Sequence, residues 1–489
     1  MPSFSPQDLE RVRRVARIAR ERHTLPGISV GIVTADAGLV FAESFGYADI
    51  EAETPLTPQH GQRIASITKT MVGLCAMALV DERKLRLDER VADLLPDVVF
   101  DGPSYDMTVW HLLTHTSGIG EAPTVERLRD VASPNRQAVR SVEEFKDLYP
   151  DGIVVEVPPG TKWAYCNNGY ALLGEIVRRK EGYRELQEIM QRRIWGPLGM
   201  RDTHILDDPH TRLATGYHRA PGEDTRFQLE RAGIPIADEA PVDGTNIRGA
   251  FTPDFNKAMR AAGGVQSTLP DMAKYAAALL KEGAGLITAQ SFRAMVSPQW
   301  CPDARLNHWG LAFALAPHHG RVAFGHGGAY FGGWNSHVDV FPADGFAVLQ
   351  HMNVMLDDPA PVFRAVIRAA LGVEPRPYPA RSADPRLLDD APGAYWLPMP
   401  GALTNFRPAT RVGPVRIARE GDSLMFTSRW GSWKGGVQLV PADPDDPALF
   451  AINRDDDDAA LVVFERDDRG AVTGLRIDEL VYMRKQTST

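Results

Sequence analysis

The spacing of hydrophobic and polar residues along the chain predicts most of its structural elements. Near the N-terminus, Leu9, Val12, Val15 and Ile18 recur at helical spacing with arginines between them. This periodicity predicts an amphipathic helix that packs one face against the fold and exposes the other.

Four other segments have the composition of strands: residues 27–35, 38–49, 310–328 and 336–354. The chain between them carries mostly helical patterns, at residues 64–80, 169–182, 183–199 and 267–283, and a helix at 360–372 follows the last strands. Because strands lie at both ends and helices in the middle, we predict a mixed α/β (α+β) domain. Its antiparallel sheet should join the N- and C-terminal strands and be flanked by helices, with a helical region beside it. Residues 207–262 are rich in Pro, Gly and charge, and we interpret them as a long excursion or lid.

The pattern changes after Val373–Pro385, which holds four prolines and is interpreted as a linker. Residues 386–489 contain short strand patterns separated by turn residues and no clear helix, which predicts a small antiparallel β-barrel. We therefore expect a first domain over 1–372, a linker over 373–385 and a second domain over 386–489. The run Asp455–Asp458 lacks the spaced ligands of a calcium loop, so we interpret it as a solvated turn.

Composition and charge exclude several functions. The formal charge of −9 argues against nucleic acid as a partner, since that requires a basic surface. No run of eighteen apolar residues predicts a membrane span, and the first residues lack the apolar core of a signal peptide, so we expect a cytoplasmic protein. Three scattered cysteines give neither a disulfide framework nor a metal-binding spacing.

Candidate chemistry begins at the start of the apolar helix over 64–80. Its only charged residue is Lys69, three positions after Ser66, so the two side chains share a helix face. Burial disfavours a charged amine, and we therefore expect a neutral amine to be accessible at Lys69. A neutral amine beside a hydroxyl at a helix start is a nucleophile with its base. The bland alternative is a chance Ser-x-x-Lys, but an idle lysine in an apolar helix is energetically costly.

A rival nucleophile motif lies at Gly27–Gly31, where "GISVG" matches the G-x-S-x-G elbow. That elbow needs a strand, a sharp turn and then a helix. Here a strand pattern continues past Gly31, so we interpret Ser29 as an ordinary strand residue.

Two further segments carry candidate site residues. In "WAYCNNGY", Tyr165 and Asn167 precede a helical pattern, with Asn168 as the expected N-cap. In "FGHGGAYFGG", His326 is the titratable group, and Gly327 and Gly328 would let the backbone approach a ligand. Taken singly, each has a bland explanation as packing or as a glycine-rich hairpin.

Taken together and in this order, the segments resemble the serine β-lactamase-like and penicillin-binding-protein superfamily, in its class C and D-aminopeptidase/esterase (peptidase S12-like) branch. Ser66–Lys69 resembles the S-x-x-K motif, Tyr165–Asn167 the Y-x-N motif, and His326–Gly328 the third motif, which is K-T-G in β-lactamases and H-x-G in D-aminopeptidases. "HLLTHTSGI" at 111–119 and the segment 261–275 are also similar to recurrent segments of this superfamily. The resemblance covers roughly residues 10–370.

The resemblance implies an acyl-enzyme route. In it, Ser66 is the nucleophile, Lys69 and Tyr165 move protons, and Asn167 orients the substrate together with His326, Gly327 and Gly328. The backbone N–H groups of Ser66 and Ala329 would form the oxyanion hole, worth on the order of 3 kcal/mol for each donor. The resemblance implies no metal and no cofactor. His111 and His115 lack a third ligand and are interpreted as structural.

One departure bears on the activity. His326 stands where β-lactamases and carboxypeptidases have a lysine, and histidine is mostly neutral at pH 7. This favours a D-aminopeptidase, amidase or esterase acting on a small amide, peptide or ester. The alternatives are an acyltransferase, a β-lactamase or D-Ala-D-Ala carboxypeptidase, and a non-catalytic ligand-binding homologue.

The second domain is similar to the lipocalin-like C-terminal domain of D-aminopeptidases, and a homodimer is the assembly that this suggests. We place the pocket rim at residues 207–262 and 300–310, and we interpret Trp309 and Tyr330 as packing residues rather than a stacking surface. Nothing in these segments names the substrate.

Overall fold

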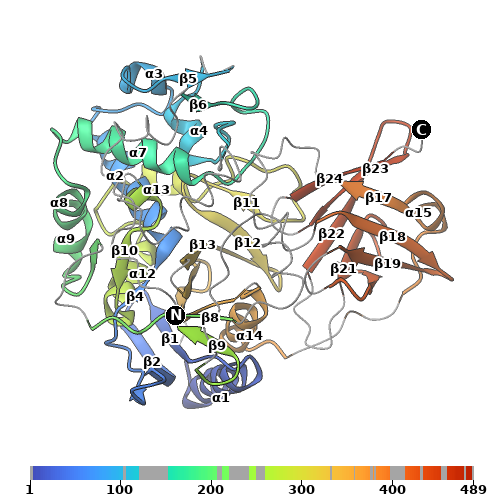
Figure 1. Ribbon diagram of the computed structural model, residues 1–489, viewed down its shortest axis with the longest axis horizontal. Helices are drawn as coiled ribbons and strands as arrows, with labels where there is room; N and C mark the ends of the chain where they lie inside the picture. The colour runs from blue at the N-terminus through green and yellow to red at the C-terminus, as the bar shows by residue number, and fades with distance from the viewer. Residues whose placement is uncertain are drawn as a thin grey trace. The chain divides into compact units, whose positions relative to one another are not determined.

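The computed structural model describes residues 4–102, 106–120, 152–205, 212–219, 242–248, 259–330, 333–356, 358–374, 378, 381–396, 413–429, 433–452, 460–477 and 481–486. The chain forms two compact units (Figure 1). The first comprises residues 1–300 and 309–372, and the second comprises residues 301–308 and 373–489.

An eight-stranded sheet is the centre of the first unit. Its order is β11 (His308–Trp309), β12 (Ala314–His318), β13 (Arg321–Tyr330), β14 (Trp334–Phe341), β15 (Phe346–Met352), β1 (Gly27–Thr34), β2 (Gly38–Asp49) and β3 (Thr54–Pro55). Strand β1 pairs antiparallel with both β2 and β15. The predicted joining of N- and C-terminal strands in one antiparallel sheet is therefore confirmed.

Helices cover both faces of this sheet. On one face, α1 (Pro6–Arg22) and α14 (Ala360–Leu371) contact each other and bury a core that includes Val12, Val30 and Val366. On the other face, α12 (Leu269–Leu280) packs against β1, β2 and β15. The alternation of side chains along each strand thus separates two hydrophobic cores.

The N-terminal helix shows how the sequence sets an element boundary. Ser5 is the N-cap of α1, and its hydroxyl accepts a hydrogen bond from the backbone N–H of Asp8, whose carboxylate in turn accepts from Ser5. Pro6 occupies the first turn, and Arg20 and Arg22 occupy the last turn, where positive charge favours the helix dipole. The predicted amphipathic helix is confirmed.

The helical region of the first unit gathers around α2 (Thr68–Asp81) and α7 (Asn167–Lys180), the blue and green helices of Figure 1. Within the described ranges, the other helices of this unit are α3 (Val91–Leu94), α4 (Val109–Leu113), α8 (Leu186–Met190), a π-helical turn (Gln191–Trp195), α9 (Gly196–Leu198), α11 (Arg260–Gly263) and α13 (Ala289–Met295). The same ranges contain three small sheets. The first consists of β4 (Gln62–Arg63), β10 (Val265–Ser267) and β7 (His204–Ile205), the second of β16 (Val354–Met355), β8 (Tyr217–Arg219) and β9 (Asn246–Arg248), and the third of β5 (Phe100–Asp101) and β6 (Ile153–Val154).

The second unit contains a closed antiparallel barrel, as predicted. Its strands are β17 (Gly393–Trp396), β18 (Val415–Glu420), β19 (Ser423–Ser428), β20 (Val437–Pro441), β21 (Leu449–Ile452), β22 (Ala460–Arg466), β23 (Val472–Ile477) and β24 (Val481–Lys485). The expectation of no helix is wrong, because α15 (Pro385–Asp390) precedes β17 with Asp384 as its N-cap. Leu387 and Leu388 of this short helix are buried in the barrel core, and tertiary packing therefore stabilises a helix that has no long periodic pattern.

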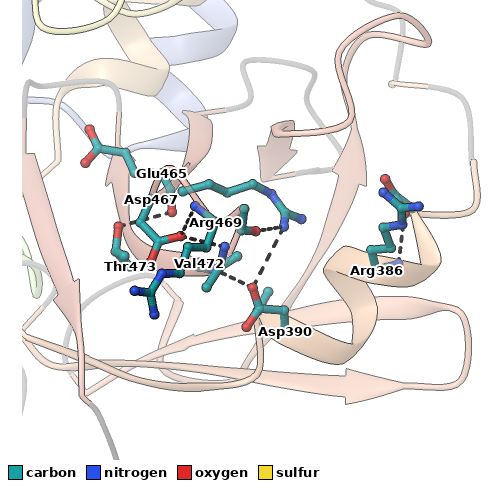
Figure 2. A network of polar contacts seen from close by, with 12 residues as sticks. Arg386, Asp390, Glu465, Asp467, Arg469, Val472 and Thr473 are labelled. Atoms are coloured by element: carbon teal, nitrogen blue, oxygen red, sulfur yellow. Dashed lines mark hydrogen bonds and ion pairs between the residues drawn. The ribbon is translucent and has the colours of Figure 1, made fainter.

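Asp390 connects α15 to the barrel strands (Figure 2). Its carboxylate accepts a hydrogen bond from the backbone N–H of Val472 and lies 3.5 Å from Lys485 Nζ and 3.8 Å from Arg466 Nη1. Nearby, the Asp467 carboxylate accepts backbone hydrogen bonds that close the turn between β22 and β23. One carboxylate thus fixes the end of the helix to three strands.

Residues 301–308 also belong to the second unit, although they fall inside the range expected for the first domain. Within this unit, Arg305 pairs with Asp303 at 2.6 Å and with Asp446 at 2.8 Å.

Most of the predicted excursion at 207–262, and all of Asp455–Asp458, lie outside the described residues. None of the helices in the described ranges is both long and apolar enough to cross a membrane.

Candidate active site

The backbone before α2 places Ser66 at the start of a buried helix. Strand β4 ends at Arg63, and Ser66 lies in a 3₁₀ turn, Ala65–Ile67, that leads directly into α2. Ala65 has φ +47°, a left-handed conformation that is uncommon for a residue with a side chain. The turn therefore carries local backbone strain immediately before the candidate nucleophile.

Lys69 is completely buried, as the apolar sequence around it predicts. Its Nζ lies 3.1 Å from Ser66 Oγ and 2.7 Å from Asn167 Oδ1, and it also donates to the carbonyl oxygen of Ala262. The amide and carbonyl oxygens can only accept hydrogen bonds, so each takes one N–H of the amine. The remaining position on the nitrogen, an N–H or a lone pair, then points toward Ser66 Oγ.

Tyr165 and Asn167 approach this pair from the start of α7. The Lys69 Nζ lies 4.9 Å from the centroid of the Tyr165 ring, and Asn167 is the first residue of the helix. The prediction that Asn168 is the N-cap of this helix is wrong. Cys166 caps the helix by accepting a hydrogen bond from Gly169 N at 3.2 Å, while Asn168 Nδ2 donates to the carbonyl of Gly120. The Asn168 side chain is buried and stabilises a neighbouring loop instead of the helix end.

Strand β13 carries the third candidate segment, His326–Ala329. A Cβ on Gly328 would lie 2.2 Å from the carbonyl oxygen of Ile64 and 2.3 Å from Ser336 Oγ. Only glycine therefore allows β13 to approach the backbone that leads into Ser66. The neighbouring Gly327 is exposed, and its missing side chain would point to the opposite face, toward His337.

His326 is buried beside aromatic rings. Its Nδ1 lies 2.6 Å from the carbonyl oxygen of Gly327, so Nδ1 carries the proton that it donates. Its ring centroid is 6.0 Å from that of Tyr165 and 5.5 Å from that of Trp309. The structure thus brings His326 and Tyr165, which are 161 positions apart in the sequence, into one cluster with Lys69.

The two histidines interpreted as structural have different surroundings. His111 Nδ1 accepts a hydrogen bond from Thr108 N at 3.0 Å and so caps α4. His115 instead lies in the aromatic cluster, with its ring stacked on Tyr165 at 4.2 Å. Its sequence surroundings, "HLLTHTSGI", gave no signal of this contact, because the two residues are brought together only by the tertiary fold.

Three other predictions concern single residues. Ser29 lies within β1, and its hydroxyl is 2.7 Å from Ser44 Oγ, so the interpretation as a strand residue is confirmed. Trp309 and Tyr330 are both buried, as expected of packing residues. Trp309 also contacts the site cluster, with Nε1 donating to Leu113 O at 3.2 Å.

Across the ranges that the structure describes, His, Cys, Asp and Glu side chains form no group of three that could hold a metal ion. The described part of the site consists of hydroxyl, amine, amide and imidazole groups.

A sheet covered by helices, with a serine and a buried lysine at the start of an internal helix, defines the class of β-lactamase-like serine hydrolases. The Beta-lactamase family model matches residues 12–371, and the chain belongs to this family.

Similarity to individual proteins agrees with this assignment. The chain is 28% identical to "Penicillin-binding protein 4" of Amycolatopsis lactamdurans over 396 residues, which cover 77% of this chain and 94% of the relative. It is 30% identical to "Esterase EstB" of Burkholderia gladioli over 218 residues, 42% of this chain and 54% of the esterase. The structure of an octameric penicillin-binding protein homologue from Pyrococcus abyssi superposes with a TM-score of 0.63 at 21% identity, covering 98% of this chain and all of that one. At this identity the last match shows the fold alone.

Proposed function

We propose that this protein hydrolyses an amide or ester bond of a small molecule through an acyl-enzyme on Ser66. The observation that carries the proposal is the environment of Lys69. Two acceptors from distant parts of the chain, Asn167 Oδ1 and the Ala262 carbonyl, orient the amine so that its third position faces Ser66 Oγ at 3.1 Å. A binding protein has no need to bury an amine in this way.

The proposed reaction has two stages. Lys69 takes the proton of Ser66 while Oγ bonds to the substrate carbonyl carbon, and the backbone N–H groups of Ser66 and Ala329 stabilise the developing oxyanion. The carbon–nitrogen or carbon–oxygen bond then breaks, and Tyr165 passes a proton to the leaving group. Water attacks the acyl-enzyme by the same route in reverse, which releases the acid and restores Ser66.

The substrate class that we favour is the amides, peptides or esters of D-amino acids and related small acyl groups. His326 supports this choice. Its Nδ1–H group donates to the Gly327 carbonyl, and a histidine offers no permanent positive charge for a substrate carboxylate. Names of relatives point the same way: they include a D-aminopeptidase of Brucella anthropi and the esterase. We further propose that residues 1–372 form the catalytic domain and that the protein self-associates, which light scattering can test.

The test is covalent labelling with a fluorophosphonate, followed by peptide mass spectrometry. We expect an adduct on Ser66 in the wild type, no adduct in Ser66→Ala, and labelling at least about 10²-fold slower in Lys69→Met. Ser29→Ala is the matched control, since Ser29 belongs to the rival motif but lies within a strand, and it should label like the wild type. Turnover by Ser66→Ala equal to that of the wild type would show that the mechanism is wrong.

A fluorescent penicillin separates the activities within the family. Labelling of Ser66 by the phosphonate alone is expected for an amidase or esterase. Labelling by both reagents would favour a β-lactamase or carboxypeptidase, and labelling by neither would favour a non-catalytic homologue. Product analysis with added alcohols or amines distinguishes hydrolysis from acyl transfer.

A further inference from the structure

His115 contacts the chain on both sides of Tyr165. Its backbone carbonyl accepts a hydrogen bond from Ala164 N at 2.9 Å. Its ring Nδ1 accepts a second hydrogen bond from Cys166 N at 3.0 Å. One residue therefore accepts hydrogen bonds from the backbone N–H groups of the residues before and after Tyr165, and it comes from a segment some 50 positions earlier in the sequence.

The imidazole ring of His115 adds a third contact. It stacks on the Tyr165 ring with centroids 4.2 Å apart and an interplanar angle of 30°. On its other sides lie the rings of Tyr170 and Trp309, each with its centroid 4.9 Å away. His115 is only 1% exposed, so these neighbours leave it little freedom to move.

The hydrogen bond from Cys166 requires that Nδ1 of His115 carry a lone pair. Burial lowers the pKa of His115 well below its ordinary value, and the nearby Lys69 and His326 lower it further. The other titratable groups against the ring, Tyr165 and Tyr170, are phenols. The acceptor at Nδ1 is therefore maintained throughout the neutral pH range.

The backbone of His115 shows that this arrangement has an energetic cost. Its φ of +58° lies in the left-handed region, which is sterically unfavourable for a residue other than glycine. Such strain persists only where the surrounding contacts impose it, and it is often found beside functional sites. Here the contacts that impose it are those with residues 164–166.

We propose that His115 is a positioning residue that holds Tyr165 in register with Lys69 and Ser66. The inference rests on the proposed function, because it assumes that Tyr165 delivers the proton to the leaving group. The proposed role affects the two kinds of substrate differently. An amine must be protonated to leave, whereas p-nitrophenolate leaves without a proton, so disturbing Tyr165 should impair amide hydrolysis far more than hydrolysis of an activated ester.

Two substitutions separate the acceptor from the rest of the side chain. His115→Asn places Oδ1 where Nδ1 was and tolerates the left-handed backbone, so it keeps the hydrogen bond and loses the ring. His115→Gly also tolerates the backbone but removes both acceptor and ring. His111→Asn is the matched control, because it retains the acceptor that caps α4 and lies away from Tyr165.

The measurement is kcat/KM for a D-alanine p-nitroanilide and the matching p-nitrophenyl ester, with circular dichroism to confirm folding. For His115→Gly we expect about a 10²-fold loss on the anilide and less than about fivefold on the ester. For His115→Asn the anilide loss should stay below about tenfold, and His111→Asn should match the wild type on both.

Equal losses on anilide and ester, or an Asn variant no better than the Gly variant, would overturn the inference while leaving the proposed function standing. If the Gly variant does not fold, the Asn variant decides alone: an anilide loss above about tenfold overturns the inference, and a smaller loss supports it. A wild type that turns over neither substrate, or a fully active Ser66→Ala, overturns the proposed function, and the role of His115 falls with it.

Discussion

The two faces of strands β12 to β14 hold histidines in contrasting ways. On the site face, His326 is held by the carbonyl of Gly327 and by aromatic rings. On the reverse face, the buried carboxylate of Asp339 lies 2.5 Å from His337 Nδ1 and 3.8 Å from His318 Nε2, and the His337 ring contacts Phe363 of α14.

The two faces differ in the kind of partner that each histidine has. On the reverse face, the carboxylate of Asp339 accepts a hydrogen bond from His337 Nδ1, and this contact suits a structural role. On the site face, His326 Nδ1 donates to a backbone carbonyl, and the ring packs beside the aromatic rings of Tyr165 and Trp309. Partners of this second kind orient the imidazole without adding a charge beside it, as a candidate site residue requires.

Substitution of the reverse-face carboxylate should give the largest effect on stability. Asp339→Asn removes the partner of His337 and His318 inside the protein, and we expect the free energy of unfolding to fall by about 3 kcal/mol. Because this face does not contact the site, kcat/KM of the folded protein should stay within about threefold of the wild type. Denaturant unfolding and steady-state kinetics measure the two quantities. Intact stability together with a tenfold loss of activity would contradict the separation of the two faces.

The adjacent glycines Gly327 and Gly328 allow a direct comparison of the two faces, because a Cβ added to each would lie on opposite faces of β13. Gly328→Ala places a Cβ against the backbone of Ile64, so β13 must move away from Ser66, and we expect roughly a 10²-fold loss in kcat/KM. In Gly327→Ala the new Cβ lies 3.2 Å from a carbon of the His337 ring, which can shift, so the loss should be much smaller. Similar losses in both variants would show that the glycines act through backbone flexibility rather than through close approach.

The smallest effect should appear in the pH dependence of stability. Burial lowers the pKa of His318 to about 4. Between pH 6.5 and 4 the unfolded chain therefore binds a proton at this residue that the folded protein does not, and stability falls as the pH falls. We expect His318 to contribute about 2 kcal/mol to the loss between pH 7 and 5.

Comparison of His318→Asn with the wild type isolates this contribution. Urea unfolding at several pH values should show a shallower pH dependence for the variant. Asp339 acts in the same direction only at lower pH: burial raises its pKa, but His337 outweighs this and holds it below the ordinary value. Identical slopes above pH 5 would mean that His318 is solvated in solution.

Much of the fold could be predicted from local patterns. The alternation of apolar and polar residues predicted the strands of the large sheet, and helical periodicity predicted α1 and α14. The short strand patterns after the proline-rich segment predicted the barrel. The short helix α15 was missed because its stability comes from burying Leu387 and Leu388 in the barrel.

The candidate site was predicted only in part, for the same physical reason. Ser66 and Lys69 are three residues apart, so helix geometry alone places them together. The Ala262 carbonyl that orients Lys69 is a backbone group 193 positions away, and any residue type could supply it. His115 likewise reaches residues 164–166 through the tertiary fold, and a histidine in an apolar segment does not reveal its partner.

The pairing of β1 with β15 also has a consequence for the protein's synthesis. Ile28 in β1 lies opposite Met352 in β15, so the middle of the sheet cannot form until more than 300 further residues have left the ribosome. At about 5–20 residues per second this delay is on the order of tens of seconds. Throughout this delay, the strand Gly27–Thr34, which is buried at every position in the finished protein, lacks its partner β15, and we expect chaperones to bind it.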